Sequence, residues 1–166
     1  MDKMPVYLIF LQSMPEAFLL VSLGSSLLGF RLEMKKVLAV ALIMAVAAYF
    51  VRALPLIPGM QVLIMAPVMV ALTALLCRLD LKYAITVVFL GLLIISAAEN
   101  IFSPVISAIT GISIKTVITE PGIRLLFPLP EFSFLAVLLI MLRSKNIVLF
   151  NIPDLMNIQQ GELNEK

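Results

Sequence analysis

Residues 37–77 read VLAVALIMAVAAYFVRALPLIPGMQVLIMAPVMVALTALLC, and Arg52 is the only charged residue among them. The apolar runs on its two sides, residues 37–52 and 60–77, are close to the length of about 20 residues that a helix needs to cross a bilayer. The segment between them, LPLIPG, holds two prolines and a glycine, which are typical of a tight turn. The stretch therefore predicts two antiparallel membrane helices joined by a short connection.

The composition of the whole chain agrees with this interpretation. Of its 166 residues, 62% are hydrophobic and 13% are charged, whereas soluble domains are about 45–50% apolar and about 25% charged. A soluble fold of about 150 residues leaves about 30% of its unfolded surface exposed, so it could not bury this much apolar surface. The chain is therefore predicted to be an integral membrane protein, an all-α polytopic helix bundle.

Three further apolar runs complete the predicted bundle. The first covers residues 4–30, and its length and weakly basic start favour a retained helix over a cleaved signal peptide. The last covers residues 123–142. Residues 83–114 are longer than one span needs, so they form either one long helix bent near Pro104 or a span followed by a re-entrant segment. We count five spans, with six as the alternative.

Basic residues predict the orientation of the bundle and its domain organisation. The connections and tail on one face carry seven basic residues: Arg31, Lys35, Lys36, Arg78, Lys82, Arg143 and Lys145. The opposite face carries four: Lys3, Arg52, Lys115 and Arg124. Because cytoplasmic loops carry the excess of lysine and arginine, the richer face is predicted to be cytoplasmic. We expect a multi-pass cell-membrane protein with a transmembrane bundle over residues 1–145 and a short cytoplasmic C-terminal tail over residues 146–166.

Small residues in the first run predict close helix packing. They are Ser22, Gly24, Ser25, Ser26 and Gly29, and Ser25 with Gly29 forms a small-xxx-small pair. Small side chains let helix backbones approach closely in lipid. Packing within the bundle is the first interpretation, and self-association through the same surface is the alternative.

Charged and polar residues inside the apolar runs are the candidate functional residues. The stretches MPEAFLL and LPEFSFL each place a glutamate directly after a proline, at Glu16 and Glu131. A charge at the centre of a membrane helix costs about 2.5–3.5 kcal/mol on insertion scales, so such residues usually face the bundle interior or a cavity. Both glutamates fall in the predicted outer half, and the helix directions bring Arg52, Glu99 and Asn100 to the same side.

The sequence thus predicts a polar cluster near the outer leaflet, made of Glu16, Arg52, Glu99, Asn100 and Glu131. The proline before each glutamate removes a backbone donor and loosens the helix, which frees a carbonyl to line a cavity. In one hypothesis the cluster binds a ligand or ion from outside. In the other, the glutamates hydrogen-bond neighbouring helices while Arg52 snorkels to the surface.

The residue types that the chain lacks exclude several function classes. It has no histidine and one cysteine, Cys77, so nucleophilic pairs with histidine, histidine-based metal sites and a phosphoacceptor histidine are excluded. Paired carboxylates alone do not complete a hydrolytic site. The net charge of +2 is too small to suggest nucleic-acid binding. We expect no enzymatic activity, no metal and no cofactor.

Four stretches carry a resemblance to a known family: MPEAFLLVSLG, VRALPLIPGMQVLIM, AENIFSPVISAITG and RLLFPLPEFSFLAVLLIMLRSK. Over roughly residues 4–145 the chain resembles the multi-span sensor region of Gram-positive membrane histidine kinases of the peptide-pheromone-receptor type. That family receives an external signal in its spans and passes it to a cytoplasmic kinase. The chain departs from the family because it lacks the kinase domain, so the resemblance implies a free-standing input module or one that acts on a separate partner.

Three functional hypotheses follow for such a chain. The first is a membrane sensor or regulatory input module without a catalytic domain, which receives an external signal and acts on a partner protein. The second is a small substrate-binding subunit of a vitamin-type solute transporter. The third is a structural subunit of a membrane assembly. The expected partners are the lipid bilayer, a kinase or a second copy of the chain, and a small-molecule or peptide ligand, with no nucleic acid.

Overall fold

The computed structural model describes residues 6–54, 60–112, 116–117 and 120–149, and every regular element in this part of the chain is a helix. In chain order the helices are α1 (Val6–Leu27), α2 (Met34–Ala53), α3 (Met60–Cys77), α4 (Leu81–Thr110), α6 (Pro121–Leu126) and α7 (Leu129–Ser144). The all-α class is confirmed for these residues. The predicted turn over LPLIPG and most of the predicted tail lie outside the described residues.

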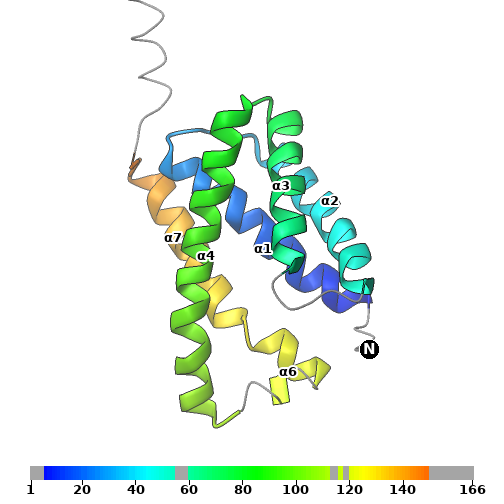
Figure 1. Cartoon of the computed structure of the whole chain (residues 1–166). Helices are drawn as coiled ribbons and strands as arrows, with labels where there is room; N and C mark the ends of the chain where they lie inside the picture. The colour runs from blue at the N-terminus through cyan, green and yellow to red at the C-terminus, as the bar shows by residue number, and fades with distance from the viewer. Residues whose placement is uncertain (1–5, 55–59, 113–115, 118–119, 150–166) are drawn as a thin grey trace, which may run out of the picture.

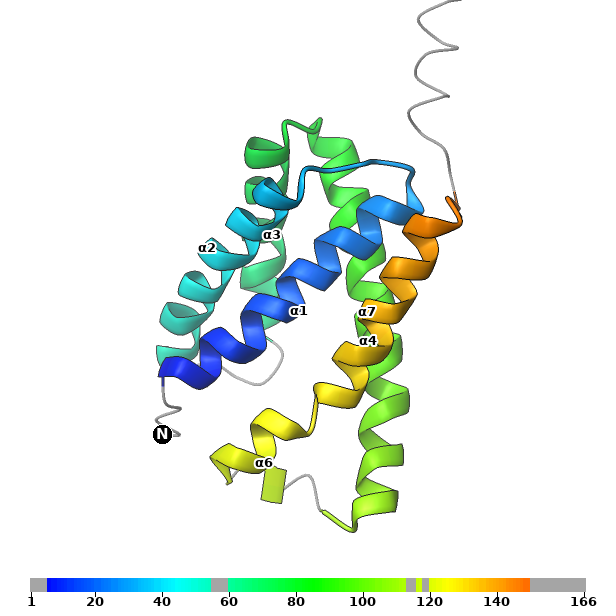
Figure 2. The same ribbon diagram turned by 180° about the vertical axis from the view of Figure 1, so that it is seen from behind.

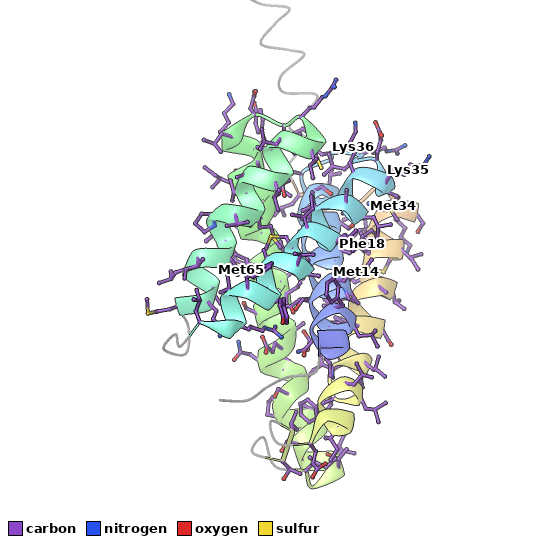
Figure 3. All side chains as sticks on the ribbon, turned by 90° about the vertical axis from the view of Figure 1, so that its right-hand side faces the viewer. Met14, Phe18, Met34, Lys35, Lys36 and Met65 are labelled. Carbon is purple, nitrogen blue, oxygen red and sulfur yellow. The ribbon has the colours of Figure 1, made fainter. Side chains whose placement is uncertain are left out.

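The helices run up and down between two ends of the bundle. In Figures 1 and 2, α1, α3 and α7 run toward one end, while α2 and α4 run toward the other. We call the first end the basic end, because seven basic residues lie in or next to its connections: Arg31, Lys35, Lys36, Arg78, Lys82, Arg143 and Lys145. Figure 3 labels Lys35 and Lys36 there. The opposite end holds α6 and is called the α6 end.

Three helices of the described chain are long and apolar enough to cross a membrane. They are the segments Met34–Arg52, Met60–Cys77 and Leu81–Thr110, which belong to α2, α3 and α4. The interpretation of the chain as a membrane protein is supported by these segments. The prediction of five spans also needs α1 and α7, and for these two helices it stays a prediction.

Residues 83–110 of the fourth apolar run form a single helix, which supports the first of the two alternatives, and residues 113 and 114 lie outside the described residues. The helix α4 has 30 residues and continues through Pro104, so at 1.5 Å per residue it is about 45 Å long. It ends at Gly111, which has a φ of 68° and donates its backbone N–H to the Ser107 carbonyl. Figure 1 shows its last turns extending beyond α2 and α3 toward α6.

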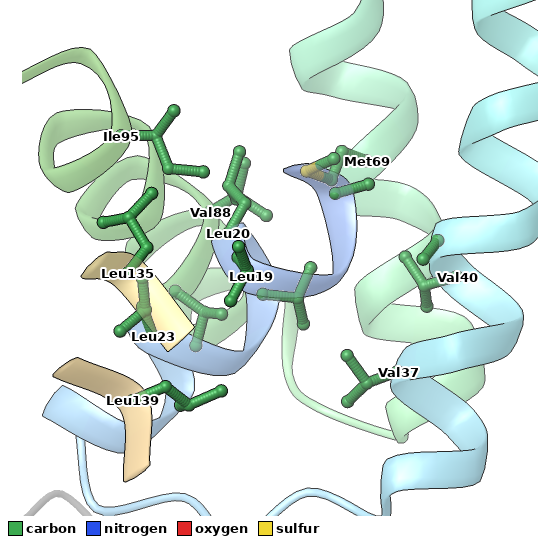
Figure 4. Close-up of a cluster of buried hydrophobic side chains, with 14 of the residues drawn as sticks. Leu19, Leu20, Leu23, Val37, Val40, Met69, Val88, Ile95, Leu135 and Leu139 are labelled. Carbon is green, nitrogen blue, oxygen red and sulfur yellow. The ribbon is translucent and has the colours of Figure 1, made fainter. Parts of the chain in front are cut away.

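The helix α1 lies at the centre of the bundle. It packs against α2, α4 and α7, and every residue from 19 to 25 is buried. Figure 4 shows its leucines, Leu19, Leu20 and Leu23, among apolar side chains of the surrounding helices. This part of α1 is buried on all sides and forms the centre of the core. By contrast, the buried residues of α3 are Met69, Thr73 and Cys77, which form one narrow seam at four-residue spacing.

Two glycines let α1 and α4 cross in backbone contact. A Cβ atom at Gly24 of α1 would lie 2.0 Å from the Val87 carbonyl oxygen of α4, and one at Gly91 of α4 would lie 2.3 Å from the Leu20 carbonyl oxygen. Such distances leave no room for any side chain. The sequence correctly indicated small-residue packing at Gly24, but Gly29 lies beyond α1 in a turn with a φ of 76°, so its predicted pairing with Ser25 as a helix-packing motif is wrong.

Large apolar side chains cover the outer surface of the bundle. On α2 the inward residues include Val37, Val40 and Met44, while Leu42 and Phe50 point outward and are 50% and 64% exposed. The outward face of α3 carries Leu63 and Leu75, each 74% exposed. Contiguous apolar surface of this kind needs an apolar solvent or a partner. Lipid provides it for helices of this length and composition.

We expect a charge in the middle of this surface to prevent stable insertion. Val68 lies near the midpoint of α3 and is 37% exposed, so Val68→Asp is expected to cost about 2.5–3.5 kcal/mol in a bilayer. At an exposed site in water the same change costs about 0.5 kcal/mol or less. The measurement is the amount of full-length protein in carbonate-washed membranes.

The matched control is Leu81→Asp at the first residue of α4, where Leu81 is 61% exposed at the basic end. An aspartate is favourable in the first turn of a helix, so this variant is expected to insert like wild type. Equal membrane levels of Val68→Asp and Leu81→Asp would contradict the assignment of the α3 surface to lipid.

Candidate functional site

A cavity of about 160 Å³ lies between α1, α2 and α3 in the half of the bundle nearer the α6 end. The helix α4 contributes Leu92 to its wall. We call it the Glu16–Arg52 cavity. It is lined by Ser13, Glu16, Ala17, Leu20, Met44, Ala48, Val51, Arg52, Gln61, Val62, Met65, Ala66, Met69 and Leu92. Most of these side chains are apolar, and a few polar groups converge among them, as is usual for small-ligand sites.

The helix α1 supplies two polar groups to the cavity. Ser13 and Glu16 are three residues apart in the helix, so they share one face of it. The Ser13 hydroxyl oxygen is buried and has no hydrogen-bond partner within the described part of the chain. Pro15 lies inside α1 between the two, and because proline has no backbone N–H it cannot donate to the Leu11 carbonyl. This turn of α1 therefore has unused hydrogen-bonding capacity.

The ends of α2 and α3 supply the remaining polar groups. Arg52 lies in the last turn of α2, where a positive charge is favourable with respect to the helix dipole. Gln61 lies in the first turn of α3, directly across the connection. Both line the cavity, and the positive charge of Arg52 acts electrostatically on Glu16. The cavity therefore combines a carboxylate, a guanidinium, an amide and a hydroxyl.

The second Pro-Glu step lies elsewhere and in a different local structure. Pro130 and Glu131 belong to the first turn of α7, where a proline is preorganised for helix formation and a carboxylate is favourable with the helix dipole. The prediction that Pro130 loosens a helix is therefore wrong, whereas Pro15 does lie inside one. Glu131 is only 7% exposed and does not line the cavity.

The five residues of the predicted polar cluster lie in three different environments. Glu16 and Arg52 line one cavity. Glu131 lies outside it but within electrostatic range of Glu16 and Glu99. Glu99 and Asn100 are exposed on α4, and the Asn100 amide nitrogen donates to the Ser96 carbonyl of its own helix at 2.7 Å. Asn100 thus uses one of its two side-chain N–H donors within its own helix.

Sequence reasoning missed several residues of the cavity. Ser13 and Gln61 are uncharged, and only the three-residue spacing from Ser13 to Glu16 could have indicated the first of them. Met44, Met65 and Met69 also line the wall, although methionines in an apolar chain are indistinguishable by sequence from lipid-facing or core side chains. Methionine is flexible and polarizable, so it adapts to ligands of irregular shape.

Neither metal ligation nor a family match identifies the site. Among the residues that the structure describes, no three histidine, cysteine, aspartate or glutamate side chains gather in a group that could hold a metal ion. No protein-family model, no curated protein and no solved structure matches the chain. The cavity and its position in the bundle are therefore the features that indicate a function.

Proposed function

We propose that the chain is an integral membrane sensor or regulatory input module that acts on a partner protein. A small external ligand enters the Glu16–Arg52 cavity and changes the packing of α1 against α2 and α3. The change reaches the basic end, where a partner protein reads it. The observation that carries this proposal is a cavity inside an apolar bundle that holds both Glu16 and Arg52. Charges at membrane depth are costly, and they mark functional sites more often than structural ones.

The proposal includes five spans, formed by α1 to α4 and α7. The 22 residues of α1 would reach about 33 Å at 1.5 Å per residue, which is enough to cross a bilayer core of about 30 Å. The 16 residues of α7 would reach about 24 Å, and α6 extends its path at the α6 end. An odd number of spans agrees with the start of α1 and the end of α7 lying at opposite ends.

The proposal also places the basic end in the cytoplasm of a cell that carries the protein in its cell membrane. Cytoplasmic connections are rich in lysine and arginine, and the seven basic residues named above lie at this end. The C-terminus is then cytoplasmic, and the Glu16–Arg52 cavity lies in the outer half of the membrane. A kinase or a second copy of the chain is the partner expected at the basic end.

The size of the cavity favours this proposal over solute import. A drug-sized ligand occupies a pocket of about 300–1,000 Å³, whereas this cavity measures about 160 Å³, close to the engineered cavity of about 150 Å³ that accommodates benzene. It fits a small ion, an amino-acid-sized ligand or one side chain of a peptide. A vitamin-sized substrate does not fit. The substrate-binding subunit of a transporter for a smaller solute remains the second candidate, because a polar cavity within the membrane suits it too.

The experiment uses the full chain, tagged and expressed in its native membrane, with Glu16→Gln as the test variant and Glu120→Gln as the control. Glu120 is exposed near the α6 end and does not line the cavity. A partner is captured by crosslinking, and the transcriptional response to external extract is recorded. We expect a reproducible partner, a response reduced about tenfold or more in Glu16→Gln by loss of one charged hydrogen bond, and a normal response in Glu120→Gln.

Two results would count against the sensor. One is the recovery of no partner together with unchanged transcription after deletion of the gene. The other is uptake of a labelled solute that Glu16→Gln abolishes and Glu120→Gln preserves, which would favour the transporter subunit instead.

A further inference from the structure

We propose that a second pocket, at the basic end between α1 and α7, binds a phosphate-type anion. The pocket has a volume of about 360 Å³ and is separate from the Glu16–Arg52 cavity. We call it the Arg31–Arg143 pocket. It is lined by Ser26, Gly29, Phe30, Arg31, Leu32, Leu142, Arg143, Asn146, Ile147 and Val148.

Two helix ends of similar construction shape this pocket. Beyond α1, Gly29 takes a φ of 76° and Phe30 donates its N–H to the Ser25 carbonyl. Beyond α7, Asn146 takes a φ of 49° and Ile147 donates to the Leu142 carbonyl. These are the left-handed residues and the six-residue closing bonds of the Schellman motif. Each motif reverses the chain sharply, so the two C-terminal turns lie around one hollow.

A backbone hydrogen bond ties the two ends together. The Leu149 N–H donates to the Leu27 carbonyl at 2.7 Å, so the chain after α7 crosses the end of α1. The Arg31 guanidinium donates to the Asn146 side-chain oxygen at 2.6 Å and links the same two segments. The pocket is therefore built by long-range contacts, because about 115 residues separate its two walls in the chain.

The arginines in this pocket retain free donors. A guanidinium has five N–H donors. Arg31 uses one of them on Asn146, and Arg143 reaches Ser26 through Nε at 3.4 Å and the weakly accepting Met34 sulfur through Nη1. Neither arginine forms a salt bridge with a carboxylate of the described residues.

The charge balance of the pocket favours an anion. The helix dipoles place roughly −0.5 of an elementary charge at the C-terminus of α1 and of α7. Arg31 and Arg143 together contribute two full positive charges, so the net charge is about +1. The wall between them is apolar and includes Phe30, Leu32 and Val148. A ligand that matches carries one negative charge with planar acceptor pairs for the guanidinium forks and an apolar portion beside it.

A phosphate group supplies the negative charge and the acceptor pairs, and two sources can provide it. One is the headgroup of an anionic phospholipid, since the pocket lies at the basic end, where anionic lipids of the cytoplasmic leaflet would gather on the proposed orientation. The other is free inorganic phosphate or a soluble phosphate monoester. The binding proposal itself does not depend on the sensor function.

The test measures ligand retention by the full-length protein in native mass spectrometry. The first arm extracts the protein from vesicles of phosphatidylglycerol and phosphatidylcholine in equal amounts, and the second adds inorganic phosphate to delipidated protein. The variants are Arg31→Gln with Arg143→Gln, and Arg31→Lys with Arg143→Lys. The control is Lys35→Gln, which removes a charge from the same end outside the pocket lining.

We expect wild type and Lys35→Gln to retain the anion in at least one arm, and the arm in which it is retained identifies the source. The double glutamine variant should lose about tenfold or more in retention, because two charged hydrogen-bonding groups are removed. The double lysine variant keeps the charge but not the fork geometry, and it should fall between the two. If the glutamine variant does not fold, the lysine variant provides the comparison. Retention of the anion in neither arm would overturn the proposal. Equal retention by wild type and by the double variants of Arg31 and Arg143 would overturn it as well.

Discussion

Replacing Gly91 with alanine is expected to destabilise the bundle by about 3 kcal/mol or more, at the upper end of what overpacking costs in protein cores. The new Cβ would lie 2.3 Å from the Leu20 carbonyl oxygen and 2.9 Å from the Leu20 carbonyl carbon. Both atoms belong to the backbone of a central helix, so α1 and α4 must separate. The higher helix propensity of alanine returns only about 1 kcal/mol. Unfolding titrations in mixed detergent measure the difference.

Gly24→Ala is expected to have a similar effect, since its Cβ would lie 2.0 Å from the Val87 carbonyl oxygen at the same crossing. The double variant should cost less than the sum of the two, because a crossing already opened by one methyl group admits the second more easily. Gly122→Ala is the control, with no atom within 4 Å of its added Cβ. Wild-type stability in Gly91→Ala, or full additivity in the double variant, would contradict the crossing.

Reversing the charge of Glu16 is expected to be the second most damaging change. Glu16→Arg places a second cation in the cavity that Arg52 already lines. Residue 16 is half-buried, and its side chain loses the electrostatic attraction to Arg52 and gains a repulsion, so we expect a loss of about 2–3 kcal/mol in the free energy of unfolding. Adding Arg52→Glu restores one charge of each sign across the cavity. The double variant should therefore recover about 1 kcal/mol or more relative to the sum of the single variants.

The four proteins of this comparison form a double-mutant cycle. Its reference is a second cycle, in which Glu120→Arg is combined with Arg52→Glu. Glu120 is exposed and lies outside the cavity lining, so screening by water should leave its coupling to residue 52 near zero. Coupling of Arg52 to residue 16 no larger than its coupling to residue 120 would show that the two cavity charges do not act on each other. The cavity would then lose its role as a charged ligand site.

The helix-bundle class could be predicted from composition because it depends on a property summed over the whole chain. Long apolar runs separated by basic connections leave few alternatives to membrane helices, and α2 and α3 begin and end within a few residues of the apolar runs. Pro104 shows the limit of local rules. A proline breaks helices in water, but in a membrane bundle neighbouring groups compensate for the lost hydrogen bond, so the continuity of α4 could not be read from its sequence.

The candidate site was predicted only in part because cavities depend on helix rotation. The sequence places Glu16 and Arg52 at similar depths, but depth does not say which way a side chain points. Glu99 was predicted at a depth similar to that of Glu16 and Arg52, but its side chain is exposed. Glu131 is buried outside the cavity. The rotation of α1 is set by its crossing with α4 at Gly24 and Gly91, a contact between residues 67 positions apart (91 − 24). No local pattern in the sequence encodes that contact.

Thiol labelling in intact cells tests most directly the central claim that the Glu16–Arg52 cavity faces the outside. In a Cys77→Ser background, Gln61→Cys places a thiol in the cavity lining and Lys145→Cys places one at the basic end. We predict that a membrane-impermeant thiol reagent labels Gln61→Cys in intact cells and labels Lys145→Cys only after permeabilisation. Labelling of Lys145→Cys in intact cells, with Gln61→Cys protected until the membrane is opened, would contradict the account.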